Sequence, residues 1–182
     1  MIGSGAGDRT RPNILVTGTP GTGKTSFASR VEEELGFTFV NVGDLVKAHG
    51  FHGGRDAEFD TLVLDEDAED RLLDHLEPIM EPGGVIVEHH SPNLFPERFF
   101  DLVLVLRAST TKVFDRLAAR GYTEKKVTEN VECEIMQVVL EEARESYDER
   151  IVQELPSNEI EDLDSNLVRV QVWLKAWQDS HK

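Results

Sequence analysis

Short apolar runs alternate with longer amphipathic segments along most of the chain. Each run is only a few residues long and nearly continuous in aliphatic side chains, as expected of parallel strands buried on both faces of a sheet. The runs occupy residues 13–17, 38–40, 85–87 and 102–106, and a fifth begins at 151–152. Strands separated by helical segments indicate an α/β fold in which helices cover both faces of a five-stranded parallel sheet.

The segments between these runs have the period of amphipathic helices. In residues 23–35, Phe27, Val31 and Leu35 recur at every fourth position, which places them on one helical face. Similar patterns predict helices over residues 66–80, over 110–120, over 128–147 as one long helix, and around 167–177.

Polar and glycine-rich segments separate these elements. Residues 50–60 contain three glycines and predict a loop, and residues 1–11 predict a flexible leader within a single domain that spans 1–182. Asp44 precedes Leu45, so a short helix is expected to begin there with the Asp44 carboxylate as its cap.

Composition narrows the classes of partner. The chain has 19 Lys and Arg against 35 Asp and Glu, a net charge of −16 at pH 7, which opposes direct binding of nucleic acid and favours a basic partner. Its apolar runs are far shorter than the roughly 20 residues of a membrane-spanning helix, so no membrane partner is expected. The single cysteine, Cys133, excludes an intramolecular disulfide. Trp173 and Trp177 of the last helix are interpreted as core residues.

A complete phosphate-binding motif follows the first strand. Residues 18–25 read GTPGTGKT, which matches G-x-x-x-x-G-K-[ST] in the strand-to-helix setting that the motif requires. Backbone amides of such a loop surround the phosphates of ATP, a Lys reaches the β and γ phosphates, and a hydroxyl ligates Mg²⁺. These roles are assigned to Lys24 and Thr25, and the motif predicts a P-loop NTPase.

A carboxylate ends a neighbouring strand. Glu88 closes the run VIVE, where P-loop enzymes place the acid that holds Mg²⁺. Glu88 is one methylene longer than Asp, so both a water-mediated contact to the metal and a role as base stay open. His90 follows and is either the group that orients a nucleophile or a loop histidine bonded to backbone.

Several arginines are expected near the transferred phosphoryl group, because planar guanidinium groups match its oxygens. Arg107, Arg116 and Arg120 follow the fourth strand, and Arg98 lies in a turn before it. Only residues 121–127 separate two helical patterns. The spacing therefore predicts a short lid, in which Arg120 supplies the main contact to the phosphate.

Taken in order, many segments resemble one family: TGTPGTGKT, NVGDL, LDED, GGVIVEHH, FPER, LVLVLR, RLAARGY, EKK and LPSN. Over about residues 12–178 the chain is similar to the atypical nuclear adenylate kinases, also described as coilin-interacting ATPases and factors of small ribosomal subunit maturation. The resemblance implies an adenylate-kinase-like fold, a nucleoside monophosphate region at about 41–64 and a lid at about 119–129.

The resemblance also implies roles for individual residues. Catalysis falls on Lys24, Glu88, His90 and Arg120, and Mg²⁺ on Thr25 and Glu88. Family members place Asp at the position of Glu88 and often Arg at that of Lys47. Arg98 is similar to the arginine that holds the AMP phosphate in ordinary adenylate kinases. The ATP contacts fall on Gly21, Thr22, Gly23, Lys24, Thr25, Ser26 and Arg120, and the monophosphate contacts on Asp44, Lys47 and Arg98.

Two functions remain open at this point. One is a nucleoside monophosphate kinase that converts ATP and AMP to two ADP and also hydrolyses ATP. The other is an ATP-driven assembly factor that binds and releases a basic small-subunit ribosomal protein. The resemblance implies a location in nucleus and cytoplasm for either.

Overall fold

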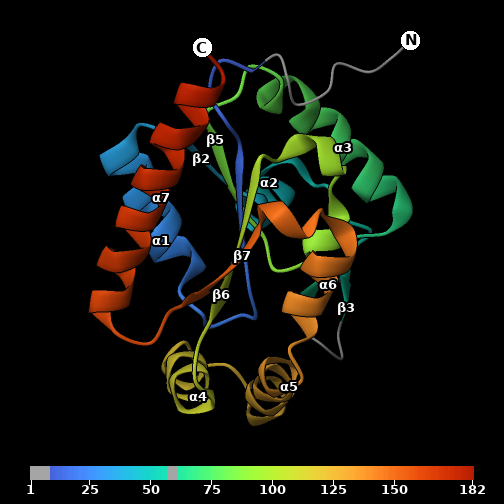
Figure 1. Ribbon diagram of the computed structural model, residues 1–182. Helices are drawn as coiled ribbons and strands as arrows, with labels where there is room; N and C mark the ends of the chain where they lie inside the picture. Colours follow the sequence, from blue (N-terminus) through green and yellow to red (C-terminus); the bar gives the residue numbers. More distant parts are fainter. Residues whose placement is uncertain (1–8, 57–60) are drawn as a thin grey trace.

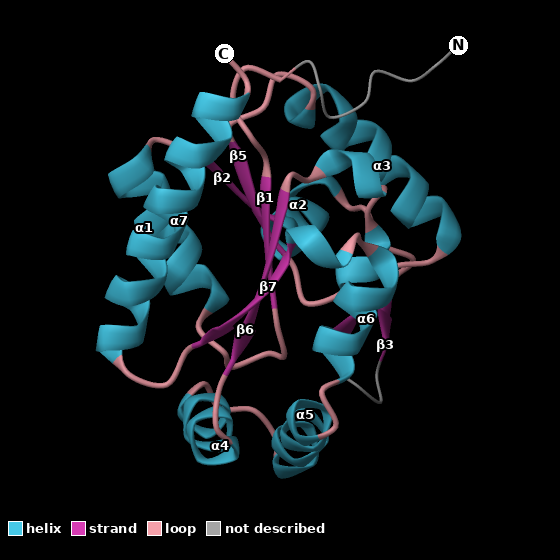
Figure 2. Ribbon diagram, in the orientation of Figure 1, coloured by secondary structure: helices cyan, strands magenta, loops and turns pink. Residues whose placement is uncertain are grey.

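One parallel sheet forms the centre of the protein (Figures 1 and 2). The computed structural model describes residues 9–56 and 61–182. Within these residues the five strands follow the order β2-β5-β1-β6-β7, and every neighbouring pair is parallel. The predicted five-stranded sheet is therefore confirmed. Its strands are β1 (Ile14–Thr17), β2 (Thr38–Asn41), β5 (Val85–Glu88), β6 (Leu102–Arg107) and β7 (Val152–Pro156).

Helices cover both faces of the sheet because successive strand residues point in opposite directions. Leu15 packs against one layer of helices, whereas Ile14 and Val16 pack against the other. The layers are visible on either side of the strands in Figure 1. The first comprises α2 (Val42–His49), α3 (Glu66–Met80) and α6 (Val138–Ser146), and the second α1 (Lys24–Leu35) and α7 (Ile160–Ser180).

A helix pair lies beyond the end of β6, at the bottom of Figure 1. It consists of α4 (Thr110–Ala119) and α5 (Glu124–Ile135). The two helices share a small apolar cluster that includes Val113, Leu117 and Val127. The remaining short elements are β3 (Arg55–Asp56) paired with β4 (Thr61–Leu62), η2 (Pro92–Leu94), η3 (Glu97–Phe99) and η4 (Glu149–Ile151).

The prediction of one long helix over 128–147 was wrong. The structure has two helices, α5 and α6, separated by Gln137, whose φ of 57° is left-handed. A left-handed residue ends the regular helical path. The break lets α5 pack on α4 while α6 packs on β6. Helix α5 also begins earlier than the expected residue 128, because Thr123 accepts a hydrogen bond from Lys126 N and caps the helix.

Two smaller predictions also need correction. Asn41, not Asp44, caps α2: its side chain accepts a hydrogen bond from Asp44 N at 3.0 Å. In the expected leader, Arg9 pairs with Asp101 at 2.8 Å and Arg11 donates to the carbonyl of Gly36 at 2.8 Å. Residues 9–11 are thus held against the domain, and residues 1–8 lie outside the described part.

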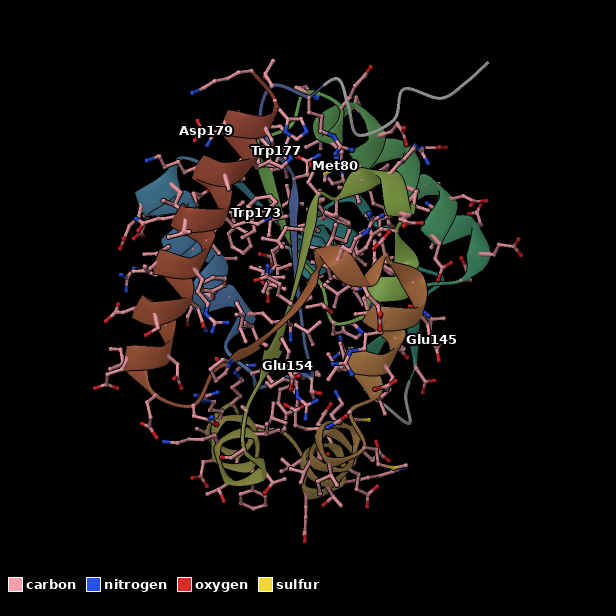
Figure 3. The ribbon with its side chains drawn as sticks, viewed as in Figure 1. Met80, Glu145, Glu154, Trp173, Trp177 and Asp179 are labelled. Atoms are coloured by element: carbon pink, nitrogen blue, oxygen red, sulfur yellow. The ribbon has the colours of Figure 1, made fainter. Side chains whose placement is uncertain are left out.

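The C-terminal tryptophans have unequal surroundings. Trp173 packs against the core cluster beneath α7, as predicted. Trp177, one turn further along the same helix (Figure 3), stacks on His181 with ring centroids 3.9 Å apart. In the described residues, no helix is long and apolar enough to cross a membrane.

Candidate active site

The P-loop turns sharply between β1 and α1. Gly18 has a φ of 153° and Gly23 a φ of 86°, and both values favour glycine. A Cβ on Gly18 would lie 2.8 Å from the Leu106 carbonyl, so β6 leaves no space for a side chain there. The amide of Thr22 donates to Thr19 O at 3.2 Å and closes the turn. The loop therefore leads directly into the N-terminus of α1, where unpaired amides favour an anion.

Lys24 lies inside this loop. Its Nζ donates to the carbonyl oxygens of Gly18 at 2.9 Å and Thr19 at 3.2 Å. Burial lowers the pKa of Lys24 to about 8, an effect that the nearby carboxylate of Glu88 opposes. A phosphate would restore a full counter-charge to this ammonium, so the site favours binding of a polyanion.

Glu88 is held from two sides at the end of β5. Thr25 Oγ1 donates to Glu88 Oε1 at 2.7 Å, and Asn41 Nδ2 donates to Glu88 Oε2 at 2.8 Å. Strand register explains the second contact, because Asn41 is paired with Glu88 across β2 and β5. The Asn41 carbonyl oxygen meanwhile caps α2. One amide thus orients the carboxylate and fixes the start of the neighbouring helix, a role that the sequence analysis missed.

The Thr25 and Glu88 oxygens fit a magnesium site. Mg²⁺ prefers oxygen ligands and usually takes only one or two protein groups together with waters and substrate phosphates. Their contact places both oxygens beside the phosphate loop, where such an ion is needed. Across residues 9–56 and 61–182, no group of three or more His, Cys, Asp or Glu could hold a metal.

Two histidines follow Glu88 and differ in exposure. His89 is 7% exposed, and its ring packs edge-on against Phe95. Burial, followed by the charges of His90 and Lys24, lowers its pKa to about 3. His90 presents an open edge to the cleft, yet surrounding protein and Lys24 still lower its pKa. Both rings are therefore neutral near pH 7.

A cleft of about 290 Å³ adjoins His90. Lys47 enters it from α2, Arg55 from β3, and Tyr122 and Lys126 from the turn and first residues of α5. The cleft also has apolar walls. Its complete lining is Gly43, Val46, Lys47, Arg55, Leu62, Leu64, His89, His90, Tyr122 and Lys126. Positive and apolar groups together suit a nucleoside phosphate.

The arginines after β6 have separate tasks. Arg116 donates to the carbonyl oxygens of Gly21 at 3.2 Å and Ser157 at 2.8 Å, so it links the P-loop to the segment after β7. Arg107 pairs with Glu134 at 3.1 Å. Arg120 is exposed at the end of α4 and close enough to Lys24 for its charge to lower that pKa. Of these three, Arg120 is the exposed one, and its charge acts on the lysine of the phosphate loop.

Two residues assigned to the monophosphate are not brought into the cleft. Arg98 binds both carboxylate oxygens of Glu77 and lines a different hollow with the two tryptophans. That hollow lies at the amino end of the sheet, because the chain returns there from β5 before β6 starts. Asp44 faces a third hollow on the other side of α2. The structure therefore brings neither Arg98 nor Asp44 into the cleft that Lys47 and His90 line.

The remaining predicted residues lie at the P-loop or in the cleft. Gly21 and Thr22 are buried in the turn, and Ser26 is exposed beside Thr25 on the first turn of α1. The Thr22 hydroxyl donates to Thr19 O at 2.8 Å, so it serves the loop itself. Lys47 and His90 share one cleft, as expected. Of the predicted monophosphate region at 41–64, residues 57–60 lie outside the described part.

Comparison with known proteins agrees with this geometry. The family described as "AAA domain" matches residues 14–137. The "Adenylate kinase isoenzyme 6 homolog" of Caenorhabditis elegans is 51% identical over 95% of this chain and 94% of its own length. The chain belongs to the adenylate kinase isoenzyme 6 family. A Schizosaccharomyces pombe homologue, 47% identical over 96% of this chain and 98% of its own, supports the same assignment. The resemblance noted in the sequence is thus confirmed.

Solved structures support the fold. A shikimate kinase from Acinetobacter baumannii, in complex with shikimate, covers 92% of this chain and 96% of its own with a TM-score of 0.66 at 16% identity. A shikimate kinase from Bacteroides thetaiotaomicron gives a TM-score of 0.60 at 14% identity over 90% and 98%. The adenylate kinase isoenzyme 6 family member described here thus has the architecture of small P-loop kinases.

Asn41→Ser tests the link between Glu88 and α2. Serine can still cap the helix, but it removes the amide that donates to Glu88 Oε2. We expect kcat for phosphoryl transfer to fall about 10- to 100-fold, the range for losing an outer partner of a metal ligand, with little change in thermal stability. Steady-state kinetics and thermal unfolding measure both. An unchanged kcat would show that Glu88 needs no support from Asn41.

His89→Gln tests the buried neutral histidine. The folded-state pKa of about 3 lies below the ordinary 6.5, so on acidification the unfolded chain takes up a proton that the folded chain refuses. Stability that is complete above pH 6.5 is therefore lost as pH falls toward 3. Between pH 7.5 and pH 4.5, the wild type should lose about 3 kcal/mol more free energy of unfolding than the variant, since two pKa units separate 6.5 from 4.5 and each corresponds to about 1.4 kcal/mol.

Urea unfolding at the two pH values measures this difference. His181→Gln is the matched control, because His181 is exposed at the end of α7. A pH-independent difference between His89→Gln and wild type would contradict the assignment of a depressed pKa to His89.

Proposed function

We propose that this protein transfers the terminal phosphoryl group of Mg²⁺-ATP to AMP and gives two ADP. The observation that best supports this proposal is the arrangement of positively charged side chains on both sides of Glu88 and His90. Lys24 and Arg120 lie on the P-loop side, and Lys47 lines the adjoining cleft. A phosphoryl group moving between two nucleotides needs such a site for each phosphate chain.

The chain's own groups supply positioning and electrostatic stabilisation. The P-loop amides and Lys24 bind the β and γ phosphates, and Arg120 neutralises charge on the transferred group. The ammonium of Lys47 binds the phosphate of AMP and brings its oxygen toward the γ phosphorus. Thr25 and Glu88 would hold Mg²⁺, which neutralises charge on the phosphate oxygens when bound.

Hydrolysis of ATP is proposed as a second reaction of the same site. The neutral ring of His90 can accept a hydrogen bond from a water molecule in the cleft when AMP is absent. The proposed lid is the short turn between α4 and α5, with Gly121 at a φ of 78°, together with the helix α5 that follows it. A lid of this size excludes water incompletely, so water competes with AMP for the phosphoryl group.

The names of the relatives support the kinase reading, since each is described as an adenylate kinase isoenzyme 6 homolog. The net charge of −16 favours the second candidate, an ATP-driven factor that binds a basic protein. We propose that this partner is a basic protein of the small ribosomal subunit. The protein would then act in the maturation of that subunit, in the nucleus and the cytoplasm. Kinase activity would then be incidental, or both activities would share one site.

Product analysis separates the two candidates. Purified protein is incubated with Mg²⁺-ATP, with and without AMP, and both ADP and free phosphate are measured. A monophosphate kinase forms two ADP per ATP when AMP is present and releases little phosphate. Phosphate release that AMP does not suppress, with one ADP per ATP, would reject the kinase and leave the ATPase. Addition of a basic ribosomal protein then tests whether that partner accelerates the release.

Arg120→Ala tests the lid contact. Removing a donor aimed at transition-state charge commonly lowers kcat by about 10² to 10³. We expect a fall of this size with a much smaller rise in KM for ATP. Arg120→Lys should recover only part of the loss, because an ammonium cannot replace the planar fork. A normal kcat with only a raised KM would assign Arg120 to ground-state binding of the nucleotide.

A further inference from the structure

The most completely buried acid of the lid, Glu134, joins three separate parts of the protein. It lies on the last turn of α5 and is 3% exposed. Its Oε1 accepts a hydrogen bond from the hydroxyl of Thr19 at 3.3 Å, in the P-loop. Its Oε2 accepts from the amide of Ala108 at 3.0 Å, directly after β6. The lid, the phosphate loop and the sheet therefore meet at one carboxylate.

Arg107 completes the connection. Its Nε lies 3.1 Å from Glu134 Oε1, and its Nη2 donates to the Glu134 carbonyl at 3.1 Å. The Arg107 side chain is 18% exposed, and within residues 9–56 and 61–182 neither its Nε nor its Nη1 has a hydrogen-bond partner, although Nε is within ion-pair distance of Glu134. The guanidinium charge thus depends on Glu134, because a buried charge without its partner is costly. The pair fixes α5 against the end of β6.

The same contacts extend to the reacting groups. Thr19, which donates to Glu134, offers its carbonyl oxygen to Lys24 Nζ. Glu134 and Arg120 also act on the Lys24 pKa in opposite directions, so both lid charges lie near the phosphate loop. Glu134 is at the last turn of α5, and Arg120 is just before its start, on the α4 side of a helix pair with a shared apolar cluster.

We propose that Glu134 is a positioning residue for phosphoryl transfer. By fixing α5 to the P-loop and to β6, it sets the position of the whole helix pair and hence of Arg120 over the phosphates. Glu134 touches no substrate in this account and acts through Arg120. The inference rests on the proposed kinase function, because it concerns the guanidinium that meets the transferred phosphoryl group.

The test is a double-mutant cycle between Glu134→Gln and Arg120→Ala. In the wild-type background, Glu134→Gln should lower kcat about 10-fold or more, since small displacements of a catalytic group are costly, and should change KM for ATP less than about threefold. In the Arg120→Ala background the same change should lower kcat less than about threefold, because the group that it positions is absent. Equal losses in both backgrounds would overturn the proposal.

Two further variants separate a loss of positioning from a loss of folded protein. Thr19→Val removes only the hydroxyl that donates to Glu134 and leaves the pair with Arg107 intact, so it should give a smaller loss that Arg120→Ala again abolishes. Glu132→Gln, an exposed acid on the same helix, should have no effect. Thermal unfolding is measured for each variant. A Thr19→Val enzyme with normal kcat, together with a Glu134→Gln enzyme that loses only stability, would reduce Glu134 to a structural residue.

The experiment distinguishes a failure of the positioning role of Glu134 from a failure of the proposed kinase function. If the wild-type protein makes no ADP from ATP and AMP, the kinase assignment fails before the cycle begins. If the wild type is active and Glu134→Gln is equally active, only the positioning role fails.

Discussion

The two hydrogen bonds received by Glu88 join the halves of the site. Thr25 belongs to the helix that follows the P-loop, and Asn41 belongs to the strand that leads into α2. Register between β2 and β5 brings Asn41 beside Glu88, and the parallel order of the sheet brings β5 beside β1. The carboxylate can therefore serve a metal at the phosphates of ATP while the same network fixes the helix that carries Lys47. Moving β5 by one residue would separate both contacts.

The lid depends on a second set of contacts at the opposite side of the P-loop. Arg116 holds the loop through the carbonyls of Gly21 and Ser157, whereas Arg107 and Glu134 hold α5 against β6. The guanidinium groups of Arg116 and Arg107 are thus engaged in contacts within the protein that hold the P-loop and α5 in place. Arg120, exposed at the end of α4, is the guanidinium that we propose for the transferred group. A small lid that is anchored this closely needs only a short movement to close.

The sequence was sufficient for the fold because its strongest signals are local. Runs such as 102–106 and the helical period in 23–35 predicted strands and helices that the structure has, and the glycines of the P-loop marked the turn. The break at Gln137 was missed because the helical pattern continues through it, and the left-handed backbone there follows from packing of α5 and α6 on different partners.

Long-range contacts account for the errors at the site. Arg98 is the last residue of an FPER segment that is similar to a phosphate-binding one, yet it lies at the amino end of the sheet and pairs with Glu77. The sequence pattern did not predict the roles of Asn41 and Glu134 at the site. An asparagine before a helix predicts only a cap, and a glutamate on a helix predicts a solvated acid. Strand register exposed the first role, and burial beside Arg107 the second.

We propose that two nucleotides bind with their phosphates meeting beside Glu88, ATP at the P-loop and AMP in the cleft beside Lys47. Calorimetric titration with a bisubstrate analogue, in which two adenosines are joined by a chain of phosphates, tests it most directly. We expect one analogue to bind per chain, Mg²⁺ to strengthen the binding, and both ATP and AMP to displace the analogue. An analogue that ATP displaces but saturating AMP leaves in place would contradict it, because the cleft beside Lys47 would then hold no nucleotide.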